Sequence, residues 1–317
     1  MNAILSFVLF AVCMFIVVKS ASLATKYSSK LAKTFHLSEF VVSFFLVAII
    51  STLPEATISI ISAFQGSSEF GMGTLIGSNV ADLLLVFGVI AVFSGRKGIP
   101  VKSEIMKKNF FYLILLICPL LLGVDGGFSR IDGILLLLAG LSFFLTLTIE
   151  SKNFSKDFKT EKERGKFIDI IFFVLSLAAL IVSAYFTIEF ATDFAKTVNV
   201  PEIIISLFFV SVGACLPEFL FSLKSIKTNH ESLALGDILG TVITDATVVL
   251  GIVAIISPFS FNPLVLIFTG GAMFLSGLFS IFFLTTDKKL TRKEGFILLG
   301  LYAVYMIIQI FLGKIVF

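Results

Sequence analysis

The chain has 317 residues, of which 57% are hydrophobic and 14% are charged, and its mean hydropathy is +1.07. This composition excludes an ordinary soluble domain and is typical of a protein that crosses a membrane many times. The formal net charge is +3, with 24 Lys and Arg residues against 21 Asp and Glu residues. The basic residues lie in short segments between apolar runs, so they report membrane topology and give no indication of nucleic-acid binding.

Apolar runs predict ten membrane-spanning segments. The first five cover 2–23, 38–64, 70–94, 108–123 and 131–149, and the last five cover 167–191, 202–225, 232–256, 262–284 and 294–313. The first run has neither a basic leading segment nor a small-residue cleavage site, so we interpret it as a helix and not as a signal peptide. We therefore predict an all-α polytopic membrane protein.

The basic residues gather on one side of these predicted spans. All 24 Lys and Arg residues except Arg130, Lys196 and Lys314 accompany the loops after the first, third, fifth, seventh and ninth spans. Cytoplasmic loops of membrane proteins carry an excess of Lys and Arg. We therefore predict a multi-pass protein of the plasma membrane, with basic loops in the cytoplasm and both termini outside the cell.

Two acidic motifs occur twice in the chain at one constant offset. The Leu-Pro-Glu segment 53–55 aligns with the Leu-Pro-Glu segment 216–218, and Asp82 aligns with Asp245. Serines and glycines around these motifs align at the same offset. A constant register across both apolar and polar positions indicates an internal repeat.

The repeat predicts an organisation in two halves. The first five-span repeat covers 1–150, a polar cytoplasmic linker covers 151–166, and the second repeat covers 167–317. Because each repeat has an odd number of spans, the second repeat is inverted in the membrane relative to the first. Inverted repeats are typical of secondary transporters, which bind their substrates at the repeat interface near the middle of the bilayer.

Four acids, Glu55, Asp82, Glu218 and Asp245, lie toward the middle of their predicted spans. An ionised residue at the centre of a membrane helix costs roughly 2.5–3.5 kcal/mol on insertion scales. No Lys, Arg or His lies at a similar depth in these spans. The proline before each glutamate is expected to break its helix and to free backbone carbonyls. We therefore expect bound cations to neutralise the acids.

The expected ligands are all oxygen atoms, from carboxylates, freed carbonyls and hydroxyl groups. The hydroxyl-bearing candidates are Ser51, Thr52, Ser78 and Thr241. Calcium takes six to eight such hard ligands, and the same ligands suit sodium. Zinc and copper are not indicated, because no suitably placed Cys and His accompany the acids. The glycines expected to let helices pack closely beside the site are Gly73, Gly77, Gly236 and Gly240.

The motif pairs STLPE with GSNVAD and ACLPE with GTVITD resemble the two alpha repeats of the sodium/calcium exchangers, in the cation/calcium antiporter superfamily. The resemblance covers essentially the whole chain. It implies a secondary active antiporter, not an enzyme, that exchanges calcium for sodium by alternating access. Calcium and sodium would be the transported substrates, no organic cofactor would be needed, and a single chain in the lipid bilayer would be functional.

The resemblance also implies individual roles, with Glu55 and Glu218 as the principal calcium ligands. The positions that complete the calcium site would be the side chains of Asp82 and Asp245 and the backbone carbonyls of Ser51 and Ala214. Sodium would share the glutamates. The further sodium positions would be Ser78, Thr241 and Thr52, with carbonyls near Ala48 and Ser211. Calcium and sodium would then compete for common ligands.

The chain departs from the common family pattern at several positions. Many exchangers have Asn at one of the positions of Asp82 and Asp245, and Ala214-Cys215 stands where Thr-Ser is common. Four ionised acids around one calcium ion leave a charge of −2, so we expect Asp82 or Asp245 to be protonated in at least one transport state. The counter-ion is left open, with proton/calcium exchange and potassium-dependent exchange on the same fold as alternatives.

Two other classes of protein also place acids in a membrane. An intramembrane aspartyl protease would carry Tyr-Asp and Gly-x-Gly-Asp signatures, and neither Asp82 nor Asp245 lies in one. A passive cation channel is disfavoured because inverted repeats with proline-broken helices are typical of carriers.

Overall fold

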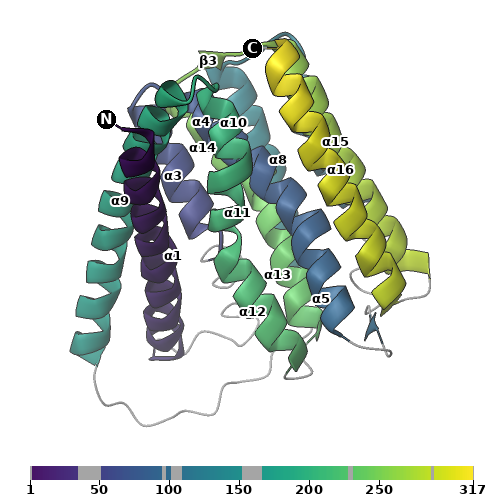
Figure 1. The fold of residues 1–317 in the computed structure, drawn as a ribbon. Helices are drawn as coiled ribbons and strands as arrows, with labels where there is room; N and C mark the ends of the chain where they lie inside the picture. Colours follow the sequence, from purple (N-terminus) through teal and green to yellow (C-terminus); the bar gives the residue numbers. More distant parts are fainter. Residues whose placement is uncertain are drawn as a thin grey trace.

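The computed structural model describes residues 2–34, 51–94, 98–100, 109–151, 166–227, 231–286 and 289–316. These residues form ten helical segments and four strands of two residues each. The part of the chain described is therefore almost entirely helical, which confirms the predicted fold class (Figure 1).

The first repeat contributes five helical segments. They are α1 (Ala3–Thr34), α3 (Leu53–Phe64), the continuous run α4 (Ser68–Val80), η2 (Ala81–Val86) and α5 (Phe87–Phe93), then α7 (Asn109–Leu122) and α8 (Arg130–Ser151). The second repeat contributes the equivalent five. They are α9 (Lys166–Thr197), the run α10 (Glu202–Ile205), η5 (Ser206–Val210), α11 (Ser211–Ala214) and α12 (Leu216–Lys227), the run α13 (Glu231–Ile243), η6 (Thr244–Val249) and α14 (Leu250–Ile256), then α15 (Pro263–Thr286) and α16 (Arg292–Val316).

Seven helical stretches in the described part of the chain are long and apolar enough to cross a membrane. Two shorter apolar helices, Leu53–Phe64 and Phe110–Leu122, lie among them. The helix α1 continues past the expected end of its span to Thr34, and α9 continues to Thr197. Neither extension contains Gly or Pro, so nothing in the sequence stops the helix where its apolar part ends.

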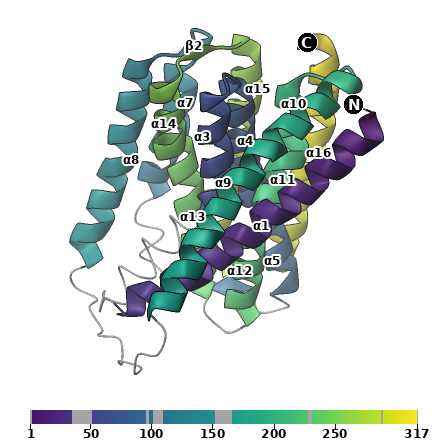
Figure 2. The same ribbon diagram turned by 90° about the vertical axis from the view of Figure 1, so that its left-hand side faces the viewer.

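Equivalent helices of the two repeats run in opposite directions. The first helix of each repeat, α1 and α9, lie side by side and antiparallel, tilted across the other helices (Figures 1 and 2). Buried apolar side chains of both helices, among them Val17, Ala21 and Ala184, belong to one cluster, and Tyr27 of α1 stacks on Phe172 of α9. The opposite direction of two equivalent helices confirms the inverted repeat.

The runs α4–η2–α5 and α13–η6–α14 form the centre of the protein. Most of the residues in the apolar part of each run are buried, whereas most of those in α9 are not. Helices such as α9 instead expose large apolar side chains, among them Phe167 at 75% and Leu175 at 58%. Such surfaces suit contact with lipid, so the central runs are the ones shielded from it.

Glycine brings one central helix very close to the opposite repeat. A Cβ atom added to Gly77 on α4 would lie 2.7 Å from the carbonyl oxygen of Leu207 and 2.8 Å from the Cβ of Ser211. A Cβ on Gly73 would collide with Ser206 in the same way. The expected close packing is therefore confirmed on α4. On α13, an added Cβ at Gly236 would meet no atom of the described residues within 4 Å, and the close packing expected at Gly236 and Gly240 stays a prediction.

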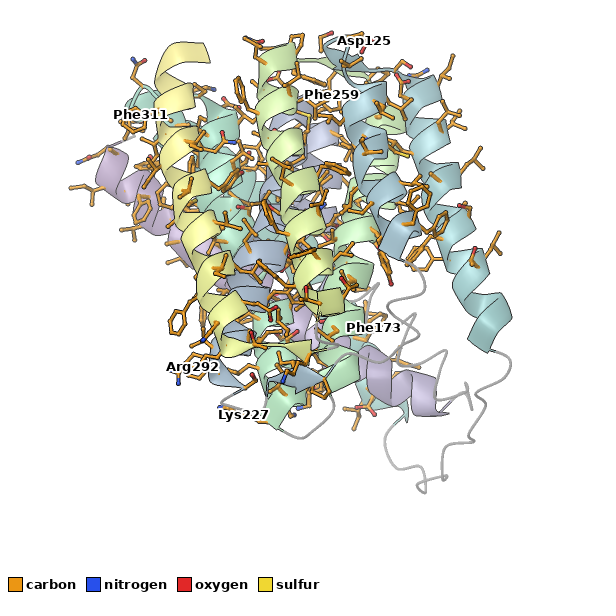
Figure 3. All side chains as sticks on the ribbon, turned by 90° about the vertical axis from the view of Figure 1, so that its right-hand side faces the viewer. Asp125, Phe173, Lys227, Phe259, Arg292 and Phe311 are labelled. Atoms are coloured by element: carbon orange, nitrogen blue, oxygen red, sulfur yellow. The ribbon has the colours of Figure 1, made fainter. Side chains whose placement is uncertain are left out.

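Two strand pairs join the repeats at the two ends of the helical bundle. Strand β1 (Ile99–Pro100) pairs with β4 (Lys289–Leu290), and β2 (Gly127–Phe128) pairs with β3 (Phe259–Ser260), both antiparallel. The β2–β3 end also holds Asp125, and the opposite end holds Lys227 and Arg292 (Figure 3). Both chain termini lie toward the β2–β3 end (Figure 1).

Substituting Gly77 by Ala should destabilise the protein, because the added methyl group would overlap the backbone of the other repeat. Overpacking of this kind costs about 1–3 kcal/mol. We expect a lower thermal denaturation temperature for the purified protein in detergent. Gly300→Ala is the matched control, since Gly300 on α16 has open space around an added Cβ. Equal denaturation temperatures for the two variants would contradict the close contact.

Candidate functional site

The two Leu-Pro-Glu motifs lie at matching breaks in their helices. The helix α3 begins at Leu53 directly after Thr52, and α12 begins directly after Cys215. The backbone angles of the two break residues are nearly the same, with φ −70° and ψ −1° at Thr52 and φ −69° and ψ −3° at Cys215. Pro217 has no N–H to donate to the carbonyl of Gly213 one turn earlier. The predicted breaks are confirmed.

Each break places a glutamate in the first turn of a helix. Glu55 lies in the first turn of α3 and Glu218 in the first turn of α12, and neither side chain has any exposed surface. The N-terminal end of a helix carries a partial positive charge and unpaired N–H groups, which favour a carboxylate there. The break therefore gives each glutamate a fixed position and a modest stabilisation of its charge.

The two aspartates lie in matching π-helical turns. Asp82 is the second residue of η2, and Asp245 is the second residue of η6. Both side chains are fully buried. Short π-helical turns inside α-helices are frequent at functional sites, because the extra residue in the turn changes where side chains point. The two repeats therefore share a local backbone distortion as well as a sequence motif.

The four acids converge between the repeats. Glu218 interacts electrostatically with Glu55 and Asp82, and Asp245 interacts with the same two residues. Glu55 and Glu218 therefore neither face lipid nor lie far apart. Both carboxylate oxygens of Glu55, Asp82 and Glu218, and Oδ1 of Asp245, are buried and have no hydrogen-bond partner among the residues that the structure describes. Unpartnered buried carboxylate oxygens are costly, and they point to a positively charged ligand.

Within the described ranges, no group of three or more His, Cys, Asp and Glu side chains has an arrangement that could hold a metal ion. A cation at this centre would need hydroxyl or carbonyl oxygens to complete its coordination. This agrees with the mixed ligand set that the sequence indicates.

Several of the expected neutral ligands surround the acids. The hydroxyl of Ser78 donates to Oδ2 of Asp245 at 3.3 Å and to the carbonyl of Leu75 at 3.0 Å. The hydroxyl of Ser211 donates to the carbonyl of Leu207. The other expected positions that are buried near the breaks are Ser51, Thr52, Ala214 and Thr241. The expected carbonyl near Ala48 lies outside the described residues.

Two polar residues at this centre were not identified from the sequence as part of the site. The thiol of Cys215 lies 3.4 Å from the carbonyl oxygen of Ser78, which links the repeats. Asp237 on α13 is 3% exposed and accepts a hydrogen bond from the Ser51 hydroxyl at 2.8 Å. Helical spacing is the signal that would have found Asp237, because residues four apart share a helix face and Thr241 follows it by four.

Comparison with known proteins places both halves of the chain in one family. Residues 5–149 and 168–311 match the family described as sodium/calcium exchanger protein. The sodium/calcium exchanger MaX1 of Methanosarcina acetivorans is 26% identical, with 93% of this chain and 95% of that protein aligned. The inner membrane protein YrbG of Escherichia coli is also 26% identical, over 98% of this chain and 99% of its own.

A solved structure shows the same fold. The sodium-calcium exchanger NCX_Mj, soaked with sodium and strontium ions, superposes on this chain with a TM-score of 0.67. The two are 25% identical, and the superposition covers 95% of this chain and 98% of that one. The two-repeat fold of a multi-pass membrane protein and the resemblance noted from the motifs are therefore confirmed.

The unpartnered carboxylates should reduce stability when no ions are present. Replacing Glu218 by Gln removes a buried charge whose desolvation costs several kcal/mol. Functional sites are commonly destabilising in this way. We expect Glu218→Gln to raise the denaturation temperature by a few degrees in an alkaline buffer that contains a chelator and choline in place of sodium. Glu189→Gln, at an exposed position on α9, should have no effect, and a lower temperature for Glu218→Gln would refute the argument.

Proposed function

Because the chain belongs to the sodium/calcium exchanger protein family, a family of transporters and not of enzymes, we propose that it exchanges calcium for sodium by alternating access. The observation that carries this proposal is the group of buried carboxylate oxygens without partners, on Glu55, Asp82, Glu218 and Asp245. A dehydrated cation supplies the positive charge that these oxygens lack, and calcium and sodium both prefer oxygen ligands.

In this proposal Glu55 and Glu218 are the principal calcium ligands, because the two helix breaks aim them at the interface between the repeats. The remaining calcium ligands are the side chains of Asp82 and Asp245 and the carbonyls of Ser51 and Ala214. Sodium uses the same glutamates together with Thr52, Ser78 and Thr241 and with carbonyls near Ala48 and Ser211. Shared ligands make the binding of calcium and sodium mutually exclusive, which couples their movements.

The moving part in the proposed cycle is the pair α1 and α9. The pair packs on the central helices through one face and exposes large apolar side chains elsewhere. Occupation of the site by either cation neutralises the acids and permits the pair to shift against the centre. The empty, charged site is too costly to close off from water, and this prevents uncoupled leakage of calcium.

Two observations bear on the choice of counter-ion. Sodium/potassium/calcium exchanger 3 of Homo sapiens shares 26% sequence identity with this chain in the aligned region. That region covers 37% of this chain and only 18% of that protein. The acids also provide sites that protons could occupy in place of sodium. Potassium-dependent exchange and proton exchange are therefore the alternatives against which sodium is tested.

We propose that the basic end of the bundle, with Lys227 and Arg292, faces the cytoplasm of a cell whose plasma membrane holds the protein. Both termini then lie outside. The repeats are 1–150 and 167–317, and the linker 151–166 is cytoplasmic.

Purified protein in vesicles should take up calcium only when a sodium gradient opposes it. Glu55→Gln or Glu218→Gln should lower uptake by about 10–100-fold or more, since each removes a charged ligand. Radioactive calcium uptake with imposed sodium, proton or potassium gradients measures this directly. Glu189→Gln is the control. Uptake driven equally without any gradient would refute antiport, and uptake driven only by a proton gradient would replace sodium by the proton.

Single cysteine substitutions test the orientation. Asp125→Cys should react with a membrane-impermeant thiol reagent on intact cells, whereas Lys227→Cys should react only after the cells are permeabilised. Both positions are exposed at opposite ends of the bundle. The unsubstituted chain, with Cys215 buried in its interior, gives the background. Labelling of Lys227→Cys on intact cells would contradict the proposed topology.

A further inference from the structure

Asp237 is a fifth buried acid that the proposed calcium site does not use. It is 3% exposed and lies on α13, two turns before Asp245. Since α13 starts at Glu231, shortly after Lys227, Asp237 lies on the side of the four acids nearer the basic end of the bundle. It interacts electrostatically with Glu55, Asp82 and Glu218.

One oxygen of this acid accepts a hydrogen bond from a hydroxyl group that itself contacts a second hydroxyl group. The hydroxyl of Ser51 donates to Oδ1 of Asp237 at 2.8 Å and lies 3.0 Å from the hydroxyl oxygen of Thr241. Oδ2 of Asp237 is buried and has no hydrogen-bond partner in the described ranges. A structural Asp in a protein interior normally has all its oxygens satisfied, so the unpaired oxygen indicates a missing ligand.

The cluster is present on only one side of the repeat axis. At the offset that aligns the two repeats, Asp237 corresponds to Thr74, Ser51 to Ala214 and Thr241 to Ser78. The hydroxyl of Thr74 donates to the carbonyl of Phe70 in its own helix, and Ala214 has no side-chain oxygen. The acid and the hydroxyl that pairs with it therefore occur together on one side and are both absent from the other.

The ligand set of this cluster fits a monovalent cation. One carboxylate and two hydroxyl groups provide hard oxygen ligands with a single negative charge, whereas calcium sites in proteins combine several carboxylates. The neighbouring carboxylates make the position more negative still, and a monovalent cation there lowers the repulsion among the five acids.

We propose that Asp237, with the hydroxyl groups of Ser51 and Thr241, binds one alkali cation at a separate position between the four acids and the basic end of the bundle. The proposal rests on the proposed exchange function, because the cation bound here is one of the transported or co-bound monovalent ions. It gives the exchanger an ion position on one side of the membrane that the other side lacks.

Binding of radioactive sodium to the purified full-length protein in detergent, measured by equilibrium dialysis without calcium, tests the proposal. Asp237→Asn and Asp237→Thr should each weaken sodium binding at one site by about tenfold or remove it. Asp237→Thr restores the residue type of the first repeat and serves as the second variant should Asn impair folding. Ser51→Ala should weaken the same site by a smaller factor. Asp125→Asn, an exposed acid at the other end, is the charge-matched control.

The outcomes separate this proposal from the exchange function. Calcium affinity measured without sodium should fall by a smaller factor than sodium binding in the Asp237 variants, because Asp237 is not among the proposed calcium ligands and acts on calcium only through its charge. Unchanged sodium binding in folded variants overturns the proposal, and so does an equal loss of calcium and sodium binding. Asp237-dependent binding of radioactive potassium with no sodium binding supports the cation site and refutes sodium coupling. If the wild-type protein binds neither sodium nor potassium, both the Asp237 site and the proposed exchange function are refuted.

Discussion

The charge of several carboxylates, held away from water without a partner, is the constraint on which the rest of this structure depends. Within the described part of the chain, the carboxylate oxygens of Glu55, Asp82 and Glu218 have no hydrogen-bond partner, although each side chain is completely buried. The protein holds these groups together through two broken helices and two π-helical turns. Tight glycine contacts such as Gly77 then bring the two repeats close enough for the acids to meet. The surrounding structure holds together charges that repel one another. This arrangement costs free energy, and bound cations offset that cost.

Much of this arrangement follows from the sequence, because membrane proteins obey strong physical rules. The apolar runs, the asymmetric placement of Lys and Arg, and the repeated Leu-Pro-Glu motif predict the helices and their inverted relation. Pro54 and Pro217 predict the breaks, since a proline removes a backbone donor. The burial of Glu55 and Glu218 could be expected from their depth in the spans. All of these are local or periodic signals.

Other features depend on contacts between distant segments, which local sequence patterns do not specify. The π-helical turns at Asp82 and Asp245 need one extra residue per turn, which no residue type specifies. Helical spacing puts Asp237 on the same face as Thr241, but only the packing of α13 against the break before α3 brings Ser51 within hydrogen-bond distance of it. The same holds for Cys215, whose partner is a backbone carbonyl of the other repeat. Glycine spacing alone does not say which face of a helix meets a neighbour, and the contact of Gly77 with Leu207 and Ser211 is known only from the packed structure.

The two strand pairs have a consequence for how such a molecule divides into moving bodies. Strands β1 and β4 tie a loop of the first half to a loop of the second at one membrane surface, and β2 and β3 do the same at the opposite surface. Because the strand pairs join the halves at both surfaces, the two halves cannot rotate apart as two rigid bodies. In a rearrangement, one part of each half must instead move together against the rest of both halves. The antiparallel pair α1 and α9, one helix from each half, meets that requirement and contains none of the four strands.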